Sequence, residues 1–132
     1  MRRHLEPGPD HPITIEPKDT PVSVKLAGDI VLVSQTHLEL REAAYPPVAY
    51  LPRTDIDLSR LIRSDHTSWC PYKGEATYFH LQTASGEIIE NAIWTYETPF
   101  PAVAAIKDAL AIYPNKVDAI EIGGRGKSPP SS

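Results

Sequence analysis

Apolar and polar residues alternate in several short runs of this chain, and this alternation is the main guide to its fold. Residues 22–26 (Val-Ser-Val-Lys-Leu) alternate, residues 27–29 form a turn, and residues 30–33 (Ile-Val-Leu-Val) are apolar. Two such runs around a Gly-Asp turn are typical of a β-hairpin. Residues 37–42 alternate again and predict a third strand.

Further alternating runs follow. Residues 46–52 are bounded by prolines, which predicts a short strand at a sheet edge, because proline cannot donate to a central ladder. Residues 76–82 lead through a turn at 84–87 into residues 88–96, and we expect these two runs to pair antiparallel. Residues 117–122 predict a final strand.

Two segments have helical spacing instead. Residues 55–62 begin with two acidic residues suited to capping, which predicts one short helical turn. Residues 102–110 follow a proline and place three apolar residues on one face, which predicts the main helix. The expected fold is mainly β, with two antiparallel sheets around a pocket and one or two short helices. The missing βαβ rhythm excludes a Rossmann or P-loop architecture.

The length of 132 residues predicts a single domain. Residues 1–20 hold four prolines among charges and predict an extended N-terminal arm. Residues 21–122 form the β-rich domain, and residues 123–132 predict a disordered polar tail.

Composition narrows the classes of partner. The net charge of −4 argues against a nucleic-acid partner, which requires basic surface. No apolar run approaches the roughly 20 residues of a membrane span, and no signal peptide is recognisable, so we expect a cytoplasmic protein. One cysteine excludes a disulfide and a zinc site built from several thiolates, and His66 and His80 lack zinc-binding spacing. We therefore expect neither a metal nor a cofactor.

Residues 66–80 concentrate the side chains that serve as nucleophiles and proton carriers. One hypothesis is an enzyme in which Cys70 is the nucleophile or redox centre, His66 the base and Lys73 an electrostatic helper. The alternative for this cysteine is a buried, inert thiol.

A second hypothesis is a small-molecule-binding domain. Trp94 and Tyr96 lie two apart on a predicted strand and so project from one face, either as a stacking platform or as core packing. The 76–82/88–96 pairing places the Tyr72-Lys73-Gly74 turn beside them. The residues expected to line the pocket are Arg53, Tyr72, Lys73, Gly74, Trp94, Tyr96 and Tyr113. Arg53 or Lys73 would face an anionic group of a planar or anionic ligand.

Four segments carry a family resemblance: Pro-Pro-Val-Ala-Tyr-Leu-Pro-Arg (46–53), Asp-His-Thr-Ser-Trp-Cys-Pro-Tyr-Lys-Gly-Glu-Ala-Thr-Tyr (65–78), Ala-Ile-Trp-Thr-Tyr-Glu-Thr-Pro (92–99) and Ile-Tyr-Pro-Asn-Lys-Val-Asp (112–118). Together they resemble a domain of unknown function, number four hundred and twenty-seven, labelled nucleotidyltransferase-like. The resemblance implies the β-tent, or Mss4-like, class, in which two antiparallel sheets splay around a pocket.

Two features of that resemblance bear on function. Many β-tent relatives hold zinc with paired Cys-x-x-Cys knuckles, which one cysteine cannot supply. The chain also has no Gly-Ser followed by an Asp-x-Asp pair, the arrangement that holds magnesium in polymerase-type nucleotide transfer. A third hypothesis is therefore a structural or interaction domain without pocket chemistry. Placement of Trp94, Tyr96 and Cys70 on one concave wall would favour binding or catalysis over it.

Overall fold

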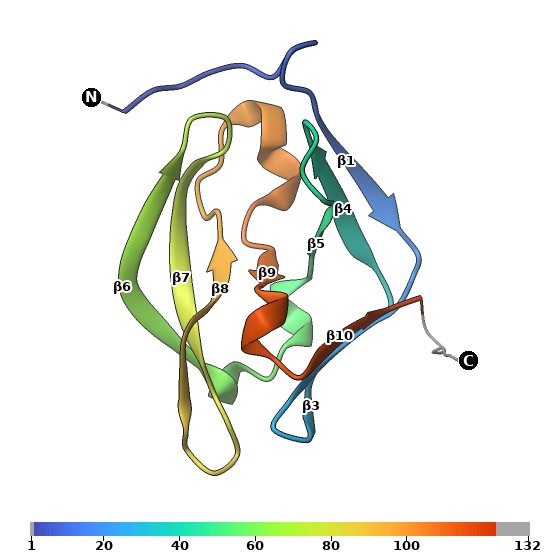
Figure 1. The fold of residues 1–132 in the computed structure, drawn as a ribbon, viewed down its shortest axis with the longest axis vertical. Helices are drawn as coiled ribbons and strands as arrows, with labels where there is room; N and C mark the ends of the chain where they lie inside the picture. Colours follow the sequence, from blue (N-terminus) through green and yellow to red (C-terminus); the bar gives the residue numbers. More distant parts are fainter. Residues whose placement is uncertain (1, 124–132) are drawn as a thin grey trace.

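The computed structural model describes residues 2–123 and is built almost entirely of antiparallel strands (Figure 1). The strands are β1 (Ile13–Lys18), β2 (Val22–Leu26), β3 (Asp29–Ser34), β4 (His37–Glu42), β5 (Val48–Tyr50), β6 (Leu61–Cys70), β7 (Gly74–Gln82), β8 (Ile88–Thr95), β9 (Leu110–Ile112) and β10 (Ala119–Ile122). The helical segments are short 3-10 turns: η1 (Arg53–Asp55), η2 (Leu58–Arg60), η3 (Pro101–Ile106) and η4 (Pro114–Lys116).

The described strands form three sheets, with orders β1-β4-β5, β10-β2-β3 and β6-β7-β8-β9. The first two lie on the opposite side of Figure 1 from β6 and β7, with β9 between them. The prediction of a mainly β, antiparallel fold is confirmed. The number of sheets is three rather than two, because β4 pairs with β1 and β5 and not with the β2–β3 hairpin.

The β2–β3 hairpin is confirmed at its predicted position, and the turn chemistry explains it. Ala27 and Gly28 both have positive φ, 51° and 83°, as a tight two-residue hairpin turn requires. The Gly28 amide also donates a 2.9 Å hydrogen bond to the Asp118 carboxylate, which ties this turn to the segment before β10.

Two strands lie where none was predicted. In β6 most side chains are exposed, so its sequence lacks a buried alternating face, although residues 61–70 pair with β7 along a bulged register. In β1 the apolar and polar residues alternate, but Pro12 before the strand and Pro17 within it argued against a strand. This strand is an edge strand, where Pro17 is tolerated, and it pairs with β4 from Ile13 opposite Glu42. The packed domain therefore begins before residue 21, and the prediction of an arm over 1–20 is wrong for β1.

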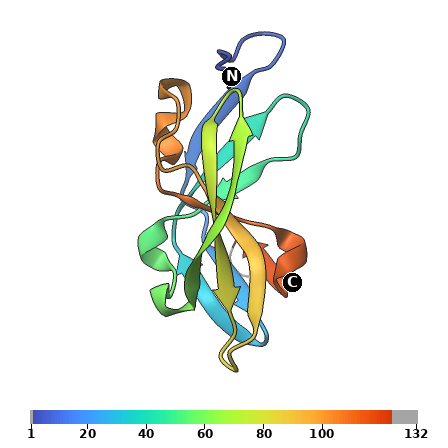
Figure 2. The same cartoon turned by 90° about the vertical axis from the view of Figure 1, so that its left-hand side faces the viewer.

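The segment preceding β1 also contacts the domain, and it crosses the end of the molecule that carries the β6–β7 turn (Figures 1 and 2). The Leu5 amide donates to the Pro71 carbonyl at 2.8 Å, and the Trp69 indole donates to the Arg3 carbonyl at 2.8 Å. The His4 ring stacks on Phe100 at 3.7 Å between centroids. The extended conformation was predicted; these contacts were not.

The predicted main helix over 102–110 is replaced by a shorter turn. η3 ends at Ile106 and is kinked at Val103, and the chain re-enters a strand at Leu110. Leu110 exchanges two 2.8 Å backbone hydrogen bonds with Leu51. This pairing overrides the local helical spacing, although the apolar face was read correctly, since Val103, Ile106 and Leu110 are all buried.

The predicted tail over 123–132 lies outside the described residues except for Gly123. Within residues 2–123, no helix has the length and apolar character needed to cross a membrane. The buried apolar side chains form two clusters, one centred on the β2–β3 hairpin and the other beneath the region described next.

Candidate functional site

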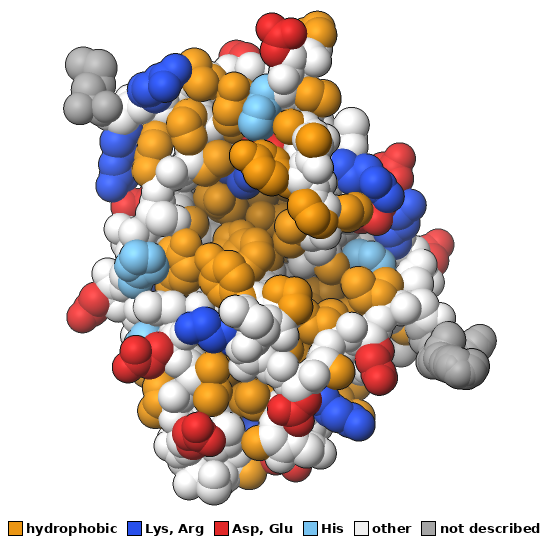
Figure 3. All heavy atoms as spheres, viewed as in Figure 1, with side chains coloured by type: hydrophobic (Ala, Val, Ile, Leu, Met, Phe, Trp, Pro, Cys, Tyr) orange, Lys and Arg blue, Asp and Glu red, His pale blue; other side chains and the backbone are white. Residues whose placement is uncertain are grey.

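A cavity of about 260 Å³ opens between the β1-β4-β5 sheet and the β6-β7-β8-β9 sheet. Its wall is formed by Leu40, Glu42, Tyr45, Pro46, Val48, Tyr50, Lys73, Tyr78, Trp94, Tyr96 and Tyr113. Figure 3 shows the corresponding hollow in the middle of this face, lined mainly by hydrophobic side chains. The cavity therefore has one wall from each of two sheets.

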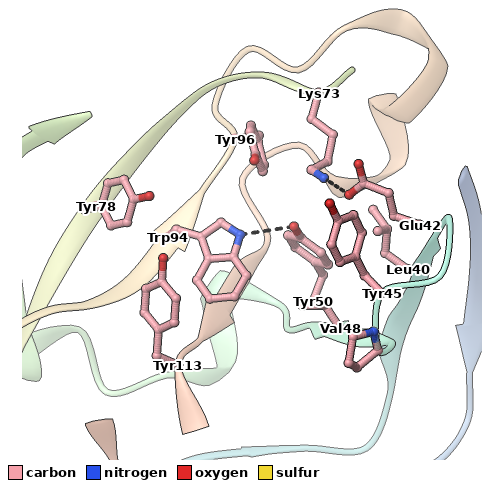
Figure 4. A pocket seen from close by; sticks show the side chains of 11 residues that line it. Leu40, Glu42, Tyr45, Val48, Tyr50, Lys73, Tyr78, Trp94, Tyr96 and Tyr113 are labelled. Carbon is pink, nitrogen blue, oxygen red and sulfur yellow. Dashed lines mark hydrogen bonds and ion pairs between the residues drawn. The ribbon is translucent and has the colours of Figure 1, made fainter. Parts of the chain in front are cut away.

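Trp94 of β8 lies at the centre of the cavity (Figure 4). Its indole N–H donates to the Tyr50 hydroxyl at 3.1 Å, across the gap between the two sheets. The Tyr50 ring meets Trp94 edge-on at 6.4 Å between centroids, and the Tyr113 ring lies 4.5 Å away. The edge-on contact is an arrangement that aromatic pairs prefer, and together with the hydrogen bond it holds the Tyr50 and Trp94 rings in place.

Tyr50, Tyr96 and Tyr113 of the cavity remain neutral hydroxyls at physiological pH. Burial raises the pKa of both Tyr50 and Tyr96 well above the ordinary value. Burial, and then the neighbouring Tyr78, raises the pKa of Tyr113 to about 12. Each phenol can therefore donate as well as accept a hydrogen bond.

The Tyr96 hydroxyl differs from those of Tyr50 and Tyr78. The Tyr78 hydroxyl has Ser68 as a partner at 2.9 Å, and the Tyr50 hydroxyl accepts from Trp94. Tyr96 is 5% exposed, its hydroxyl points into the cavity, and it has no hydrogen-bond partner among residues 2–123 (Figure 4). The hydroxyl is open to the cavity, where a ligand could offer it a hydrogen-bond partner.

Lys73 reaches the cavity from the β6–β7 turn, where it is 8% exposed, and its ammonium donates to the Glu42 carboxylate. The other Glu42 oxygen is 2.7 Å from Nε2 of His11. Burial alone would raise the pKa of Glu42, but the hydrogen bonds from Lys73 and His11 outweigh it and hold that pKa below its ordinary value. Lys73 and Glu42 thus form an ion pair whose charges cancel locally.

Four of the predicted ligand-binding residues, Lys73, Trp94, Tyr96 and Tyr113, meet in this cavity. Trp94 and Tyr96 share it because they project from one strand face, as the period of two predicts. The turn lies beside the far end of β8 as expected, since the Phe100 amide donates to the Lys73 carbonyl at 3.0 Å.

The structure places the other three elsewhere. Arg53 lies outside the cavity, and its guanidinium donates to the Asp108 carbonyl, the Thr95 hydroxyl and the Glu97 carboxylate at 2.9–3.1 Å. Tyr72 stacks on His11 at 3.9 Å between centroids and holds the N-terminal segment. Gly74 has a φ of +112°, so its role is to let the chain enter β7.

The predicted catalytic group is not assembled in the described part of the chain. Cys70 is half-buried against the apolar cluster behind the cavity, and no hydrogen bond joins its sulfur to a histidine among residues 2–123. His66, exposed on β6, instead packs against the Tyr78 ring at 4.5 Å. Across the same residues, no group of three or more His, Cys, Asp or Glu side chains is placed to hold a metal ion.

Sequence reasoning missed the opposite wall of the cavity, which includes Glu42, Tyr45 and Tyr50. Tyr50 lies in a segment predicted as an edge strand, but nothing local shows that β5 faces β8. The signal that could have found it is the concentration of tyrosines within residues 45–50, beside a sheet edge.

Comparison with known protein families gives a match that covers nearly all of the described residues. Residues 14–123 match the family described as a domain of unknown function (DUF427), whose model carries the label NTP_transf_9. The chain belongs to this family. The match begins within β1 and ends after β10, so it includes both walls of the cavity. No curated protein matches the chain.

Proposed function

We propose that this DUF427 domain binds a small, flat molecule in the cavity around Trp94. The observation that carries the proposal is that Trp94, Tyr50 and Tyr96 converge there, with the Tyr96 hydroxyl unpaired among the described residues. Aromatic side chains supply contact area, and a few fixed polar groups select the orientation of the ligand.

The charges favour a neutral ring over an anion at the centre of the cavity. The expectation from the sequence that a cation faces an anionic group of the ligand requires an available ammonium, whereas Lys73 is paired with Glu42. An anion placed here would compete with a carboxylate already in contact. A ring that displaces solvent from the Tyr96 hydroxyl must offer it another partner, so a ring with a hydrogen-bond acceptor is favoured.

The size of the cavity supports a compact ligand. Its volume of about 260 Å³ is at the small end of ligand sites, which run from about 300 to 1,000 Å³ for drug-sized molecules. We also propose that the domain is of the β-tent class, because antiparallel sheets that diverge around an aromatic pocket are what that class implies. The third sheet is an addition to the two that were expected.

Tryptophan fluorescence can test the proposal, because the chain has two tryptophans, Trp69 and Trp94, and one of them lies in the cavity. A Trp69→Phe variant leaves Trp94 as the one indole, and titration with a library of flat aromatic fragments should change its emission. The matched Trp94→Phe variant keeps Trp69, which lies against Arg2 and Phe100 outside the cavity, and its emission should not respond. Equal responses from both variants would place binding elsewhere.

Tyr96→Phe removes the unpaired hydroxyl alone. For fragments that carry an acceptor, we expect the dissociation constant to rise about tenfold, the value of one hydrogen bond of about 1.4 kcal/mol. The free energy of unfolding should not fall, because no hydrogen bond within the described residues is lost. Unchanged affinity in this variant, with fragments that still quench Trp94, would remove Tyr96 from the proposal.

A further inference from the structure

The aromatic cavity continues at both ends into neighbouring hollows. One, of about 150 Å³, shares Val48 and Trp94 with it. The other, of about 300 Å³, shares Tyr78 and Tyr113. The shared lining residues place the three hollows next to one another; we call them together the groove, and its two ends differ in chemistry.

The first end is apolar. Besides the shared residues, its described lining consists of prolines, alanine, leucine and isoleucines: Pro47, Ala49, Leu51, Ile112, Pro114, Ile120 and Ile122. No side chain in this set donates or accepts a hydrogen bond, so this end cannot fix a polar substituent.

The second end is polar and carries a cation. Its own lining residues are His66, Asn91, Asn115 and Lys116, and none of the described residues lining it is acidic. The Lys116 ammonium donates one 2.9 Å hydrogen bond to the Glu90 carbonyl, which leaves two N–H groups. No carboxylate among residues 2–123 lies within salt-bridge distance of it, in contrast to Lys73, which is paired with Glu42.

Backbone geometry fixes the distance between this cation and the aromatic cavity. Tyr113, whose ring lies 4.5 Å from Trp94, immediately precedes η4 (Pro114–Lys116). The Lys116 amide donates back to the Tyr113 carbonyl at 3.0 Å. Asn115 and Lys116 are therefore held within one turn of a ring that belongs to the cavity itself.

We propose that the end formed by His66, Asn115 and Lys116 is a carboxylate subsite, and that the ligand is a flat aromatic acid. This rests on the proposed function: the ring occupies the cavity at Trp94, and the carboxylate extends past Tyr113 to the Lys116 ammonium and the Asn115 amide. An ammonium and neutral donors recognise a carboxylate through charge-assisted hydrogen bonds. The anion anchor of the groove is thus Lys116, and not the Lys73 or Arg53 that the sequence suggested.

The test compares 2-naphthoate with 2-naphthamide, which have the same ring and nearly the same shape but differ in charge. Calorimetric titration at pH 7.5 should show the acid binding about tenfold more tightly than the amide. Because an exposed ammonium is screened by salt, this ratio should shrink between 50 and 300 mM NaCl.

Lys116→Met should bring the ratio of the two affinities close to one while leaving amide binding unchanged, and Asn115→Ala should reduce the ratio in part. Lys107→Met is the matched control, because Lys107 is an exposed lysine outside the groove, and its ratio should stay as in the parent. Equal affinities for acid and amide in the parent, or a ratio that survives Lys116→Met, would overturn the subsite.

The two proposals fail in different ways. If both probes quench Trp94 with equal affinity, the subsite is wrong and the proposed function stands. If neither probe binds, both are wrong, because a flat bicyclic ring is what the cavity is proposed to accept.

Discussion

Lys73 shows at the scale of a single residue how a side chain can lie beside the expected strand and yet be paired with a group that its local sequence does not indicate. Its place in a turn beside the Trp94 strand follows from local pattern and strand pairing. Its partner Glu42 is 31 residues away on another sheet, and nothing near Lys73 in the sequence indicates that pairing. The same holds for Arg53, whose donors are used by Thr95, Glu97 and Asp108.

Removing one member of the Lys73–Glu42 pair should cost more than removing both. Glu42→Gln leaves a buried ammonium without its carboxylate, and we expect the free energy of unfolding to fall by about 3 kcal/mol, the lower end for broken buried pairs. Lys73→Met combined with Glu42→Gln should recover most of that loss. Urea denaturation measures both. If the double variant were as unstable as the sum of the single variants, the two groups would not be coupled.

At the scale of elements, alternation located the strands with one buried face and missed those without one. The β2–β3 and β7–β8 pairs have clear alternating burial, and both were predicted. β6 is largely exposed and lacks the pattern, whereas β1 alternates over its first four residues but was obscured by the surrounding prolines. Both strands nevertheless pair with a neighbour. The Tyr50 wall of the cavity was missed for a different reason: its strand was predicted, but the long-range packing that sets it opposite Trp94 has no local signal.

Because β1 is part of the fold, the packed domain begins before residue 21. A chain that begins at residue 21 lacks β1 and exposes the edge of β4, whose Glu42 also loses His11. We expect it to be aggregated or unfolded by size exclusion and circular dichroism, because an uncovered strand edge is a template for association. A chain that begins at residue 13 keeps β1 and should fold, with reduced stability from the loss of the stacked His4 and His11 rings. A fully stable chain from residue 21 would show that β1 is dispensable.

At the scale of the whole molecule, paired carboxylates predict how stability depends on acid. Hydrogen bonds from Arg63 and Arg53 outweigh burial and lower the pKa of Glu97, and that of Glu42 is lowered as well. A carboxyl whose pKa is lower in the folded state than in the unfolded state stabilises the fold at pH values above 4.5, the ordinary pKa of glutamate. That contribution is lost as the pH falls through the folded-state pKa.

We therefore expect the urea midpoint to fall between pH 5 and pH 3, and to fall less steeply in Glu97→Gln. Glu87→Gln, at an exposed position in the β7–β8 turn, is the control and should follow the parent. Identical slopes in all three proteins would show that the Glu97 cluster does not contribute to acid sensitivity.

The reciprocal hydrogen bonds between Leu51 and Leu110 join the two sheets that carry the cavity walls. They lie directly after Tyr50 and at the start of β9, so they hold the β5 wall and the β8 wall together at one edge of the cavity. These bonds set the separation of the two walls, while the groove is open along its length. For the ligand proposed above, we therefore expect discrimination by thickness more than by length: a planar ring could carry long substituents along the groove, whereas a puckered or branched ring of the same mass should not fit.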